Sequence, residues 1–250
     1  MESFLAGLPR PTPFTTFLLL VPEKLKYLNS RVELFFNNIV PLENSIAIID
    51  QKRLFSTSGI NYLKIKVINA FEDHEIGEKM KVRLIPKICD LEEIYSYPVQ
   101  KRVDLARDLF SHLNFLDEFW ITLPQNEISV ENPFIQSADF ACVLISEKLE
   151  EIVYSYELIK SLHRSGFFSP FIIFCANSNE IQHGERVFER LQGVARQFLS
   201  LDLLYGGMLI SSGKSDEFSS PQQFTNIVNS IEKRTRNFFL RFSESFLKKK

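Results

Sequence analysis

The sequence predicts an α/β protein, in which a doubly wound, mostly parallel sheet lies between two layers of helices. Apolar runs of strand length alternate along the chain with stretches whose apolar residues recur at helical spacing. Parallel strands need long crossover connections, and such helices supply them. The 250 residues are 45% hydrophobic and 24% charged, which suffices for one large domain with a full core. These observations together favour a three-layer α/β/α architecture.

The first half of the chain alternates in this way after a short lead-in. Three prolines within residues 1–13 make that segment incompatible with helix or central strand. The predicted strands, which are apolar or alternating, span residues 14–21, 45–50, 62–68, 81–86 and 118–123. The predicted helices, with apolar residues three and four positions apart, span residues 25–40 and 99–116.

The second half shows the alternation more clearly. Its predicted strands span residues 140–145, 171–175 and 204–210, and its predicted helices span 152–162 and 187–199. Residues 211–223, rich in Ser, Gly, Asp and Pro, are predicted to form a loop. We therefore expect a Pro-rich lead-in at 1–13, an α/β domain at 14–223 and a basic amphipathic helix at 224–250.

Bulk composition excludes several function classes. A net charge of −2 and a pI near 6.1 give no overall attraction to nucleic acid. The three cysteines have no CxxC spacing, and no secretory signal precedes them, so we expect a reducing cytoplasm. The Glu-Asp-His-Glu cluster at 72–75 is predicted to be a solvated loop, because consecutive side chains do not converge on one metal ion.

The segment 137–210 carries a recognisable pattern. Ala138-Asp139 precedes an apolar strand, Tyr156 and Lys160 give a Tyr-x-x-x-Lys helix, and Tyr205-Gly206-Gly207 opens the last strand. This pattern resembles the C-terminal half of the MinD/ParA group of P-loop ATPases (the SIMIBI type), and within it the flagellar-number regulator branch FlhG. The resemblance implies the P-loop NTPase fold. An unrelated Rossmann-like fold with the same layout stays open as the alternative.

The glycines of that family's phosphate-binding loop are missing from the corresponding part of this sequence. No glycine lies between Gly7 and Gly59. When the family's loop is laid after the first predicted strand, Lys24 falls on its signature lysine and Ser30 on its magnesium-binding hydroxyl, while Asn29 replaces its phosphate lysine. Side chains at the glycine positions exclude the positive φ angles that a backbone phosphate nest requires.

The other catalytic positions of the family differ as well. Its Asp-x-Asp motif corresponds to Asp50 followed by Lys52 two residues later. Its switch segment corresponds to Thr122 in place of an Asp, to Pro124, which is kept, and to Asn126 in place of a Gly. The resemblance thus implies a pseudo-ATPase with no cofactor and no catalytic residue. The alternative is an active ATPase with an atypical phosphate loop, built around Lys24, Lys26, Ser30 and Asp50, which would need ATP and magnesium.

The C-terminal helix combines an aromatic face with a basic end. The residues that we expect to contact a membrane or a partner are Phe238, Phe239, Arg241, Phe242, Phe246 and Lys248. Aromatic burial and attraction to anionic lipid act together in such helices. The alternative is a helix whose Phe residues pack on the sheet.

The resemblance implies a regulatory function. We expect a non-catalytic MinD/FlhG-like bacterial protein that acts through a protein partner, either an active paralogue or a flagellar or polarity factor. Flagellar placement or number, or cell polarity, is the expected process. The expected location is the cytoplasm, including a peripheral site at the inner face of the cytoplasmic membrane.

Overall fold

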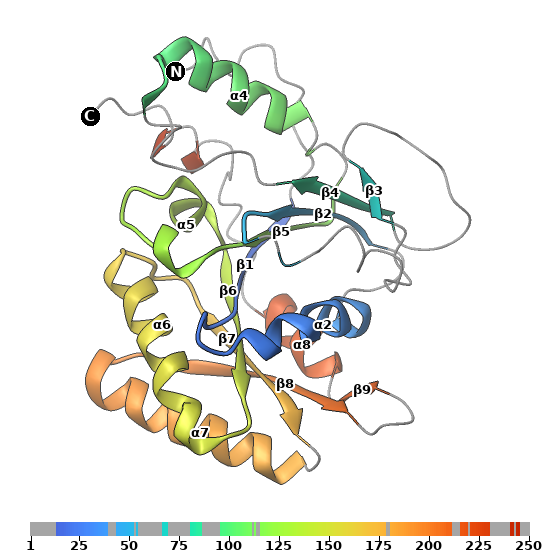
Figure 1. The fold of residues 1–250 in the computed structure, drawn as a ribbon, viewed down its shortest axis with the longest axis vertical. Coiled ribbons are helices and arrows are strands. Elements are labelled where there is room, and N and C mark those ends of the chain that lie inside the picture. Colours follow the sequence, from blue (N-terminus) through green and yellow to red (C-terminus); the bar gives the residue numbers. More distant parts are fainter. Residues whose placement is uncertain are drawn as a thin grey trace.

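One large mixed sheet dominates the structure of the chain, which is a computed structural model. The structure describes residues 14–39, 44–52, 54, 67–69, 81–86, 96–111, 113, 116–178, 181–211, 216–219, 221–230, 241–242 and 244–245. Within these residues nine strands form one sheet in the order β3-β4-β2-β5-β1-β6-β7-β8-β9 (Figure 1). Each neighbouring pair is parallel except β8 and β9, which are antiparallel. The predicted doubly wound, mostly parallel sheet is therefore confirmed.

The strands alternate with helices along the chain. The strands are β1 Thr15–Leu20, β2 Ser45–Asp50, β3 Val67–Asn69, β4 Lys81–Pro86, β5 Glu118–Thr122, β6 Phe140–Ser146, β7 Phe171–Ser178, β8 Leu203–Ser211 and β9 Asp216–Ser219. The α-helices are α2 Val32–Ile39, α4 Val99–Ser111, α5 Pro133–Ser137, α6 Ile152–Arg164, α7 Ile181–Leu199 and α8 Pro221–Ser230. The short 3-10 helices are η1 Lys26–Arg31, η3 Gln125–Glu127 and η4 Leu149–Glu151.

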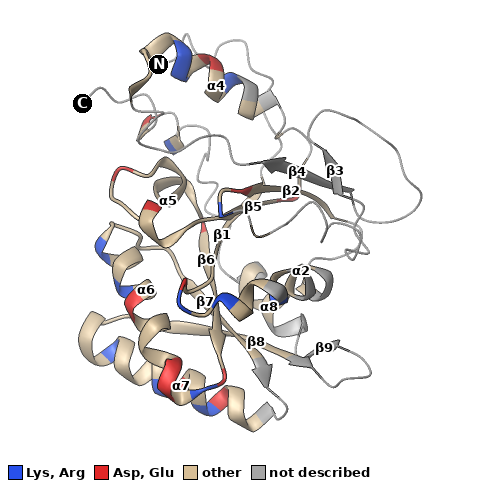
Figure 2. Cartoon of the chain, in the orientation of Figure 1, with Lys and Arg blue, Asp and Glu red and all other residues tan. Residues whose placement is uncertain are grey.

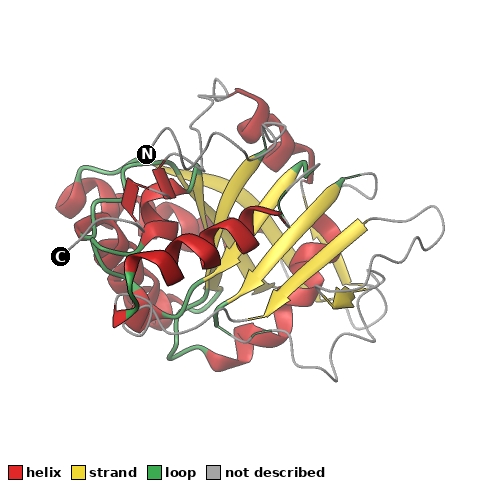
Figure 3. Ribbon diagram, turned by 90° about the horizontal axis from the view of Figure 1, so that it is seen from above, coloured by secondary structure: helices red, strands yellow, loops and turns green. Residues whose placement is uncertain are grey.

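Two hydrophobic cores lie on opposite faces of the sheet (Figures 1 and 3). One core joins the sheet to α4, α5, α6 and α7, and the other joins it to α2 and α8. All seven residues of β6 are buried, as expected for a central parallel strand that is covered on both faces. Helices on both faces confirm the three-layer arrangement.

Aromatic side chains fill the core under α2 and α8. The ring of Phe17 in β1 stacks on Trp120 in β5 at 4.2 Å between centroids. Phe35 of α2 meets Phe174 of β7 edge-on at 4.8 Å, and Phe224 of α8 lies 5.6 Å from Phe174. Burial of each large side chain contributes roughly 1.5–3 kcal/mol. These contacts fix both helices onto the same face of the sheet.

Two aspartates fix strand positions at the opposite, amino end of the sheet. The backbone N–H of Thr16 in β1 donates to Asp139 Oδ2 at 3.0 Å, just before β6. The N–H of Ser45 in β2 donates to Asp117 Oδ2 at 2.8 Å, just before β5. Each carboxylate thus satisfies an amide of a neighbouring strand, and such charge-assisted bonds are stronger than neutral ones.

Several predicted boundaries need correction. The helix predicted at 25–40 begins as the 3-10 helix η1, and the helix predicted at 99–116 ends at Ser111. The loop predicted at 211–223 is wrong in part, because it contains β9 and the start of α8. Pairing with β8, from Met208–Ser219 to Ser211–Asp216, supplies the hydrogen bonds that override the turn-rich composition.

One short helix was absent from the sequence-based prediction, and other predictions fall where nothing is described. Asn132 begins α5: its side chain accepts the N–H of Phe134 at 2.9 Å, and Pro133 occupies the first helical position. The lead-in at 1–13, the cluster at 72–75 and most of the strand predicted at 62–68 lie outside the described residues.

Candidate functional site

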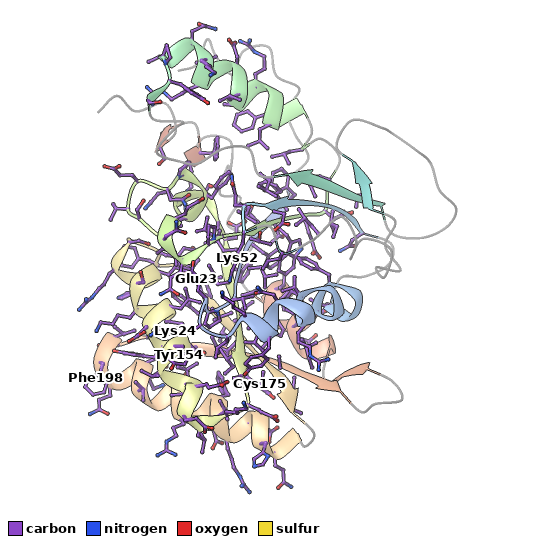
Figure 4. The ribbon with its side chains drawn as sticks, viewed as in Figure 1. Glu23, Lys24, Lys52, Tyr154, Cys175 and Phe198 are labelled. Atoms are coloured by element: carbon purple, nitrogen blue, oxygen red, sulfur yellow. The ribbon has the colours of Figure 1, made fainter. Side chains whose placement is uncertain are left out.

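The candidate site lies where β1, β2 and β5 end. These strands are neighbours in the order β2-β5-β1 and run parallel, so their carboxyl ends share one edge. Ligands of open α/β sheets bind outside the carboxyl ends of the strands. Figure 4 shows Glu23 near Lys52 at this edge, and Lys24 next to Tyr154 of α6.

The loop that follows β1 is a tight turn anchored by apolar side chains. The N–H of Leu25 donates to the carbonyl of Pro22 at 3.0 Å, and the N–H of Leu28 donates to the carbonyl of Leu25 at 2.9 Å. Both leucine side chains are buried. In a phosphate nest the backbone amides point outward to the ligand. Here two of these amides are bonded to carbonyls of the loop itself.

Two charged side chains close the loop against its neighbours. Glu23 Oε1 accepts the backbone N–H of Gln125 at 2.9 Å, at the start of η3. The ammonium of Lys52, just after β2, donates to the carbonyl of Val21, and its backbone N–H donates to Thr122 Oγ1 at 3.2 Å. Burial lowers the pKa of Lys52 to about 8, while the nearby Glu23 carboxylate acts in the opposite direction. The loop is therefore held by β2 and β5 together.

The carboxylate of Asp50 is occupied by internal donors. It is 4% exposed, and its Oδ1 accepts the hydroxyl of Thr122 at 2.7 Å and the N–H of Leu54 at 2.8 Å. Pro124 lies on the same edge and directly precedes η3. Asp50 and Thr122 end the neighbouring strands β2 and β5, and Pro124 lies two residues after β5. Asp50 serves a structural hydrogen-bond network.

A second set of contacts joins the loop and η1 to the start of α6. The hydroxyl of Tyr27 lies 2.7 Å from Ser146 Oγ and donates to the Glu151 carboxylate. Burial and the Glu151 hydrogen bond raise the pKa of Tyr27 to about 12. Lys148 Nζ lies 3.6 Å from Glu151 Oε1, and Lys24 Nζ lies 4.8 Å from the ring centre of Tyr154. Lys24 is exposed, and its ammonium faces α6.

The remaining two residues of the predicted nucleotide site lie in η1. Asn29 has its Oδ1 buried and without a hydrogen-bond partner in the structure. Ser30 belongs to the same 3-10 helix, but its side chain lies outside what is described. In P-loop proteins the corresponding residues begin an α-helix that points at the phosphates; here the first turns have 3-10 geometry.

The contacts of Tyr27 with Ser146 and Glu151 were missed by sequence reasoning. They join residues more than a hundred positions apart, and they follow from the pairing of β1 with β6. The apolar runs alone identify both strands but do not identify their neighbours. A prediction of strand order would have placed the ends of β1 and β6 together.

The predicted membrane or partner helix is described in small part only. Phe242 is 1% exposed, and its ring lies 5.7 Å from that of Phe110 and 5.2 Å from that of Phe134. Its burial agrees with the core-packing alternative, so Phe242 is not available to a membrane in this conformation. Arg241 is partly buried beside it. Phe238, Phe239, Phe246 and Lys248 lie outside the described residues.

Other site types receive no support from the described ranges. None of the helices there combines the length and apolar character needed to cross a membrane. The same ranges hold no group of three or more His, Cys, Asp or Glu side chains arranged to bind a metal ion. Charges of both signs are interspersed along α7 (Figure 2), so this helix lacks the continuous basic face that nucleic-acid binding requires.

Comparison with solved structures identifies the fold. The chain is similar to a plasmid partition protein from Borrelia burgdorferi, with a TM-score of 0.52, 12% identity, and coverage of 88% of this chain and 99% of that chain. Weaker likenesses are an ATP complex of McdA from Cyanothece (TM-score 0.48, 10% identity, 94% and 96% covered) and MinD from Aquifex aeolicus (0.45, 10%, 92% and 95%). No protein-family model matches the chain, and no curated protein matches its sequence. The chain therefore has the α/β fold of the MinD/ParA-type P-loop NTPases.

Proposed function

We propose that the chain is a non-catalytic regulatory protein of MinD/ParA-like fold that acts through protein contacts. One observation carries this proposal: the loop after β1 is closed by the chain's own groups. Lys52 donates to the carbonyl of Val21, Glu23 accepts the amide of Gln125, and Leu25 donates within the turn. The position that phosphates occupy in P-loop proteins is thus bordered by a carboxylate, without a glycine nest.

Opening the loop for a nucleotide would cost several interactions at once. The Lys52 bond is partly buried and involves a charged group, and such a bond contributes roughly 1.5–3 kcal/mol, whereas the Glu23 bond is exposed to solvent and contributes less. Breaking the Lys52 bond would weaken nucleotide binding by roughly one to two powers of ten, since about 1.4 kcal/mol is a tenfold change in affinity. Asp50 is also held by Thr122 and Leu54, so it does not face the loop as a free base.

The biological process follows from the sequence resemblance. Residues 137–210 resemble the FlhG branch, which supports a role in flagellar placement or number, or in cell polarity. We propose a protein partner, either an active paralogue or a flagellar or polarity factor, in the cytoplasm or at the inner face of the cytoplasmic membrane. No cofactor is part of this proposal.

The test is calorimetric titration of the full chain with millimolar ATP and magnesium. The proposal expects no saturable heat. Saturable binding, together with magnesium-dependent hydrolysis that Lys24→Ala abolishes, would establish the atypical-ATPase alternative instead. Arg107→Ala serves as the matched control, because Arg107 is exposed on α4 and pairs with Asp104 in the same helix, away from the site.

Membrane contact is a separate part of the proposal and concerns the chain's end. The residues assigned to it are Phe238, Phe239, Arg241, Phe246 and Lys248, and the buried Phe242 is left out. Flotation with phosphatidylglycerol vesicles tests it. A triple Lys→Glu change at 248–250 is expected to abolish flotation without altering the unfolding transition, because attraction to anionic lipid depends on these charges. Equal flotation of the unmodified chain and the triple variant would contradict the proposed membrane contact.

A further inference from the structure

The helix α6 has exposed apolar side chains at both of its ends. Four of the seven large apolar side chains that face solvent among the described residues lie there. They are Leu149 and Val153 at the start of the helix, and Val130 and Phe168 at its end, with exposed fractions of 46%, 45%, 63% and 80%. Single exposed apolar side chains are common on soluble proteins, whereas grouped ones mark contact surfaces. Each end of α6 is therefore a candidate contact surface.

The surface at the start of α6, called the acidic surface, consists of Leu149, Glu150, Val153 and Glu157. Leu149, Val153 and Glu157 follow one another at intervals of four residues, so they lie on one side of η4 and α6. Glu150 and Glu157 form no ion pair within the described residues, whereas Glu151 pairs with Lys148. The acidic surface thus combines two apolar side chains with two carboxylates that have no cationic partner there.

The surface at the end of α6, called the basic surface, consists of Val130, Lys160, Arg164 and Phe168. Gln136 Nε2 donates to the carbonyls of Val130 and Ser165 at 3.3 and 3.4 Å, which joins the loop before α5 to the turn after α6. Lys160 and Arg164 form no ion pair in the part of the chain that the structure describes. The basic surface thus combines two apolar side chains with two cations.

The turn after α6 holds Phe168 in its exposed position. Gly166 has a φ of +85°, and its N–H donates to the carbonyl of His163 at 3.1 Å, while the N–H of Phe167 donates to that of Leu162 at 3.3 Å. Phe167 is buried, and the ring of His163 meets that of Phe168 edge-on at 5.7 Å. A side chain that is already held in place loses little conformational freedom when it binds. Phe168 is therefore suited to anchor a contact.

The acidic and basic surfaces lie at opposite edges of the sheet. The helix α6 connects the parallel strands β6 and β7, so it begins at the carboxyl edge of β6 and ends at the amino edge of β7. Its 13 residues span about 20 Å. The helix dipole accounts for the sign of the charges at each end, but not for the exposed apolar side chains beside them. One chain cannot bring its two surfaces into contact, but two copies placed end to end can.

We propose that the chain associates head to tail, with the acidic surface of one copy against the basic surface of the next. The apolar side chains of the two surfaces then pack together, and the carboxylates of one face the cations of the other. Opposite charges favour this pairing and disfavour contacts between two like surfaces. Such a contact leaves one surface free at each end, so that further copies add to form a ring or an open chain. The interface is small, and the association is therefore weak and dependent on concentration.

The experiment is sedimentation of the full chain across the micromolar range, with two variants that each lack one surface. Val130→Ser with Phe168→Ser alters the basic surface, and Leu149→Ser with Val153→Ser alters the acidic surface. The unmodified chain is expected to grow beyond a dimer as its concentration rises, and each variant alone to associate about tenfold or more weakly. An equal mixture of the two variants is expected to form dimers that do not grow, because each variant supplies one intact surface.

The control is Val99→Ser, which removes an exposed apolar side chain from the start of α4, away from α6 (Figure 1). This variant is expected to associate as the unmodified chain does. Added salt is expected to weaken the association of the unmodified chain, because the facing charges are screened. Thermal unfolding shows whether each variant is folded. If a serine variant is unfolded, Lys160→Gln with Arg164→Gln, or Glu150→Gln with Glu157→Gln, replaces it in the same mixing experiment.

Three results would overturn the proposal. The first is an unmodified chain that stays monomeric across the whole range. The second is a dimer that does not grow, because it would show a self-complementary contact in place of a head-to-tail one. The third is a mixture of the two folded variants that associates no better than either variant alone.

Discussion

The carboxyl edge of β1, β2 and β5 differs from the layer formed by β6, α6, β7, α7 and β8 in what holds it together. At the edge, the contacts are polar: the hydroxyl of Thr122 donates to Asp50, and the ammonium of Lys52 donates to the carbonyl of Val21. The second region is held by apolar burial, as in β6, where every residue is buried. The edge thus depends on hydrogen bonds and the second region on apolar packing, so we expect the two regions to respond to different substitutions.

The largest expected effect concerns the apolar contacts that hold the chain's end. Phe242→Ala is expected to lower the free energy of unfolding by about 4 kcal/mol, because a buried ring against Phe110 and Phe134 would leave a cavity. Urea denaturation measures the change. Phe198→Ala is the control, since Phe198 is 64% exposed on α7 and its truncation is expected to change stability by less than about 0.5 kcal/mol. Similar values for both variants would place Phe242 outside the core.

A smaller loss is expected at the tightest point of the second region. At Gly206 an added Cβ would lie 2.5 Å from Phe174 Cε1 and 2.7 Å from Ile172 Cγ2, both in β7. Gly206→Ala is therefore expected to cost about 2 kcal/mol through overpacking. Gly193→Ala in α7 meets no atom within 4 Å and is expected to stabilise the chain by up to about 1 kcal/mol. Urea denaturation measures the change in the free energy of unfolding for both variants, and the two changes are expected to have opposite signs. Changes of the same sign would contradict the close contact between β7 and β8.

At the carboxyl edge the expected losses come from unpaired polar groups. Thr122→Val removes the hydroxyl that donates to Asp50 and accepts from the N–H of Lys52. Leaving the buried carboxylate with one donor fewer is expected to cost about 1.5 kcal/mol. Thr122→Ser keeps the hydroxyl and is expected to recover most of that loss. Thermal unfolding of both variants decides the point, and an unchanged Thr122→Val protein would show that the network is dispensable.

The smallest expected effect is a pH dependence of the free energy of unfolding, which arises from Lys52 at the carboxyl edge. The folded pKa of Lys52, about 8, lies below its ordinary value of 10.5, so the unfolded chain binds more protons between these values. This contribution to stability is present above about pH 10.5 and is lost as pH falls through about 8. Relative to Lys52→Met, the original chain should gain about 1 kcal/mol between pH 7 and about 8.7. Parallel curves for the two proteins would contradict the burial of this cation.

Much of the fold could be predicted from the sequence because, in most helices and strands, the spacing of apolar residues matches the residues that are buried in the structure. The apolar run at 140–145 became β6, and the helix predicted at 152–162 became most of α6. The prediction failed at 211–223, where β9 depends on pairing with β8 and not on its own composition. Edge strands of this kind are set by tertiary contacts that local patterns do not record.

The candidate site was predictable in position and only partly in detail. Asp50, Thr122 and Pro124 lie at or just after the ends of the predicted strands 45–50 and 118–123, and the parallel pairing of β2 with β5 brings these ends to one edge. The contact between Tyr27 and Glu151 depends on the order of β1 and β6 in the sheet, which periodicity does not specify. The sequence around Phe242 is aromatic, and such a pattern is compatible with either membrane contact or core packing. In the structure, the rings of Phe110 and Phe134 surround Phe242, which therefore packs in the core.

The most direct test of the closed loop is amide hydrogen exchange at Leu25 and Leu28, with and without millimolar ATP and magnesium. Both amides are bonded within the loop and η1. We predict slow exchange at these two positions that the nucleotide leaves unchanged, because both amides are already bonded to carbonyls of the chain. Fast exchange that becomes slow when ATP is added would show an open loop that the nucleotide orders, and would contradict the central claim.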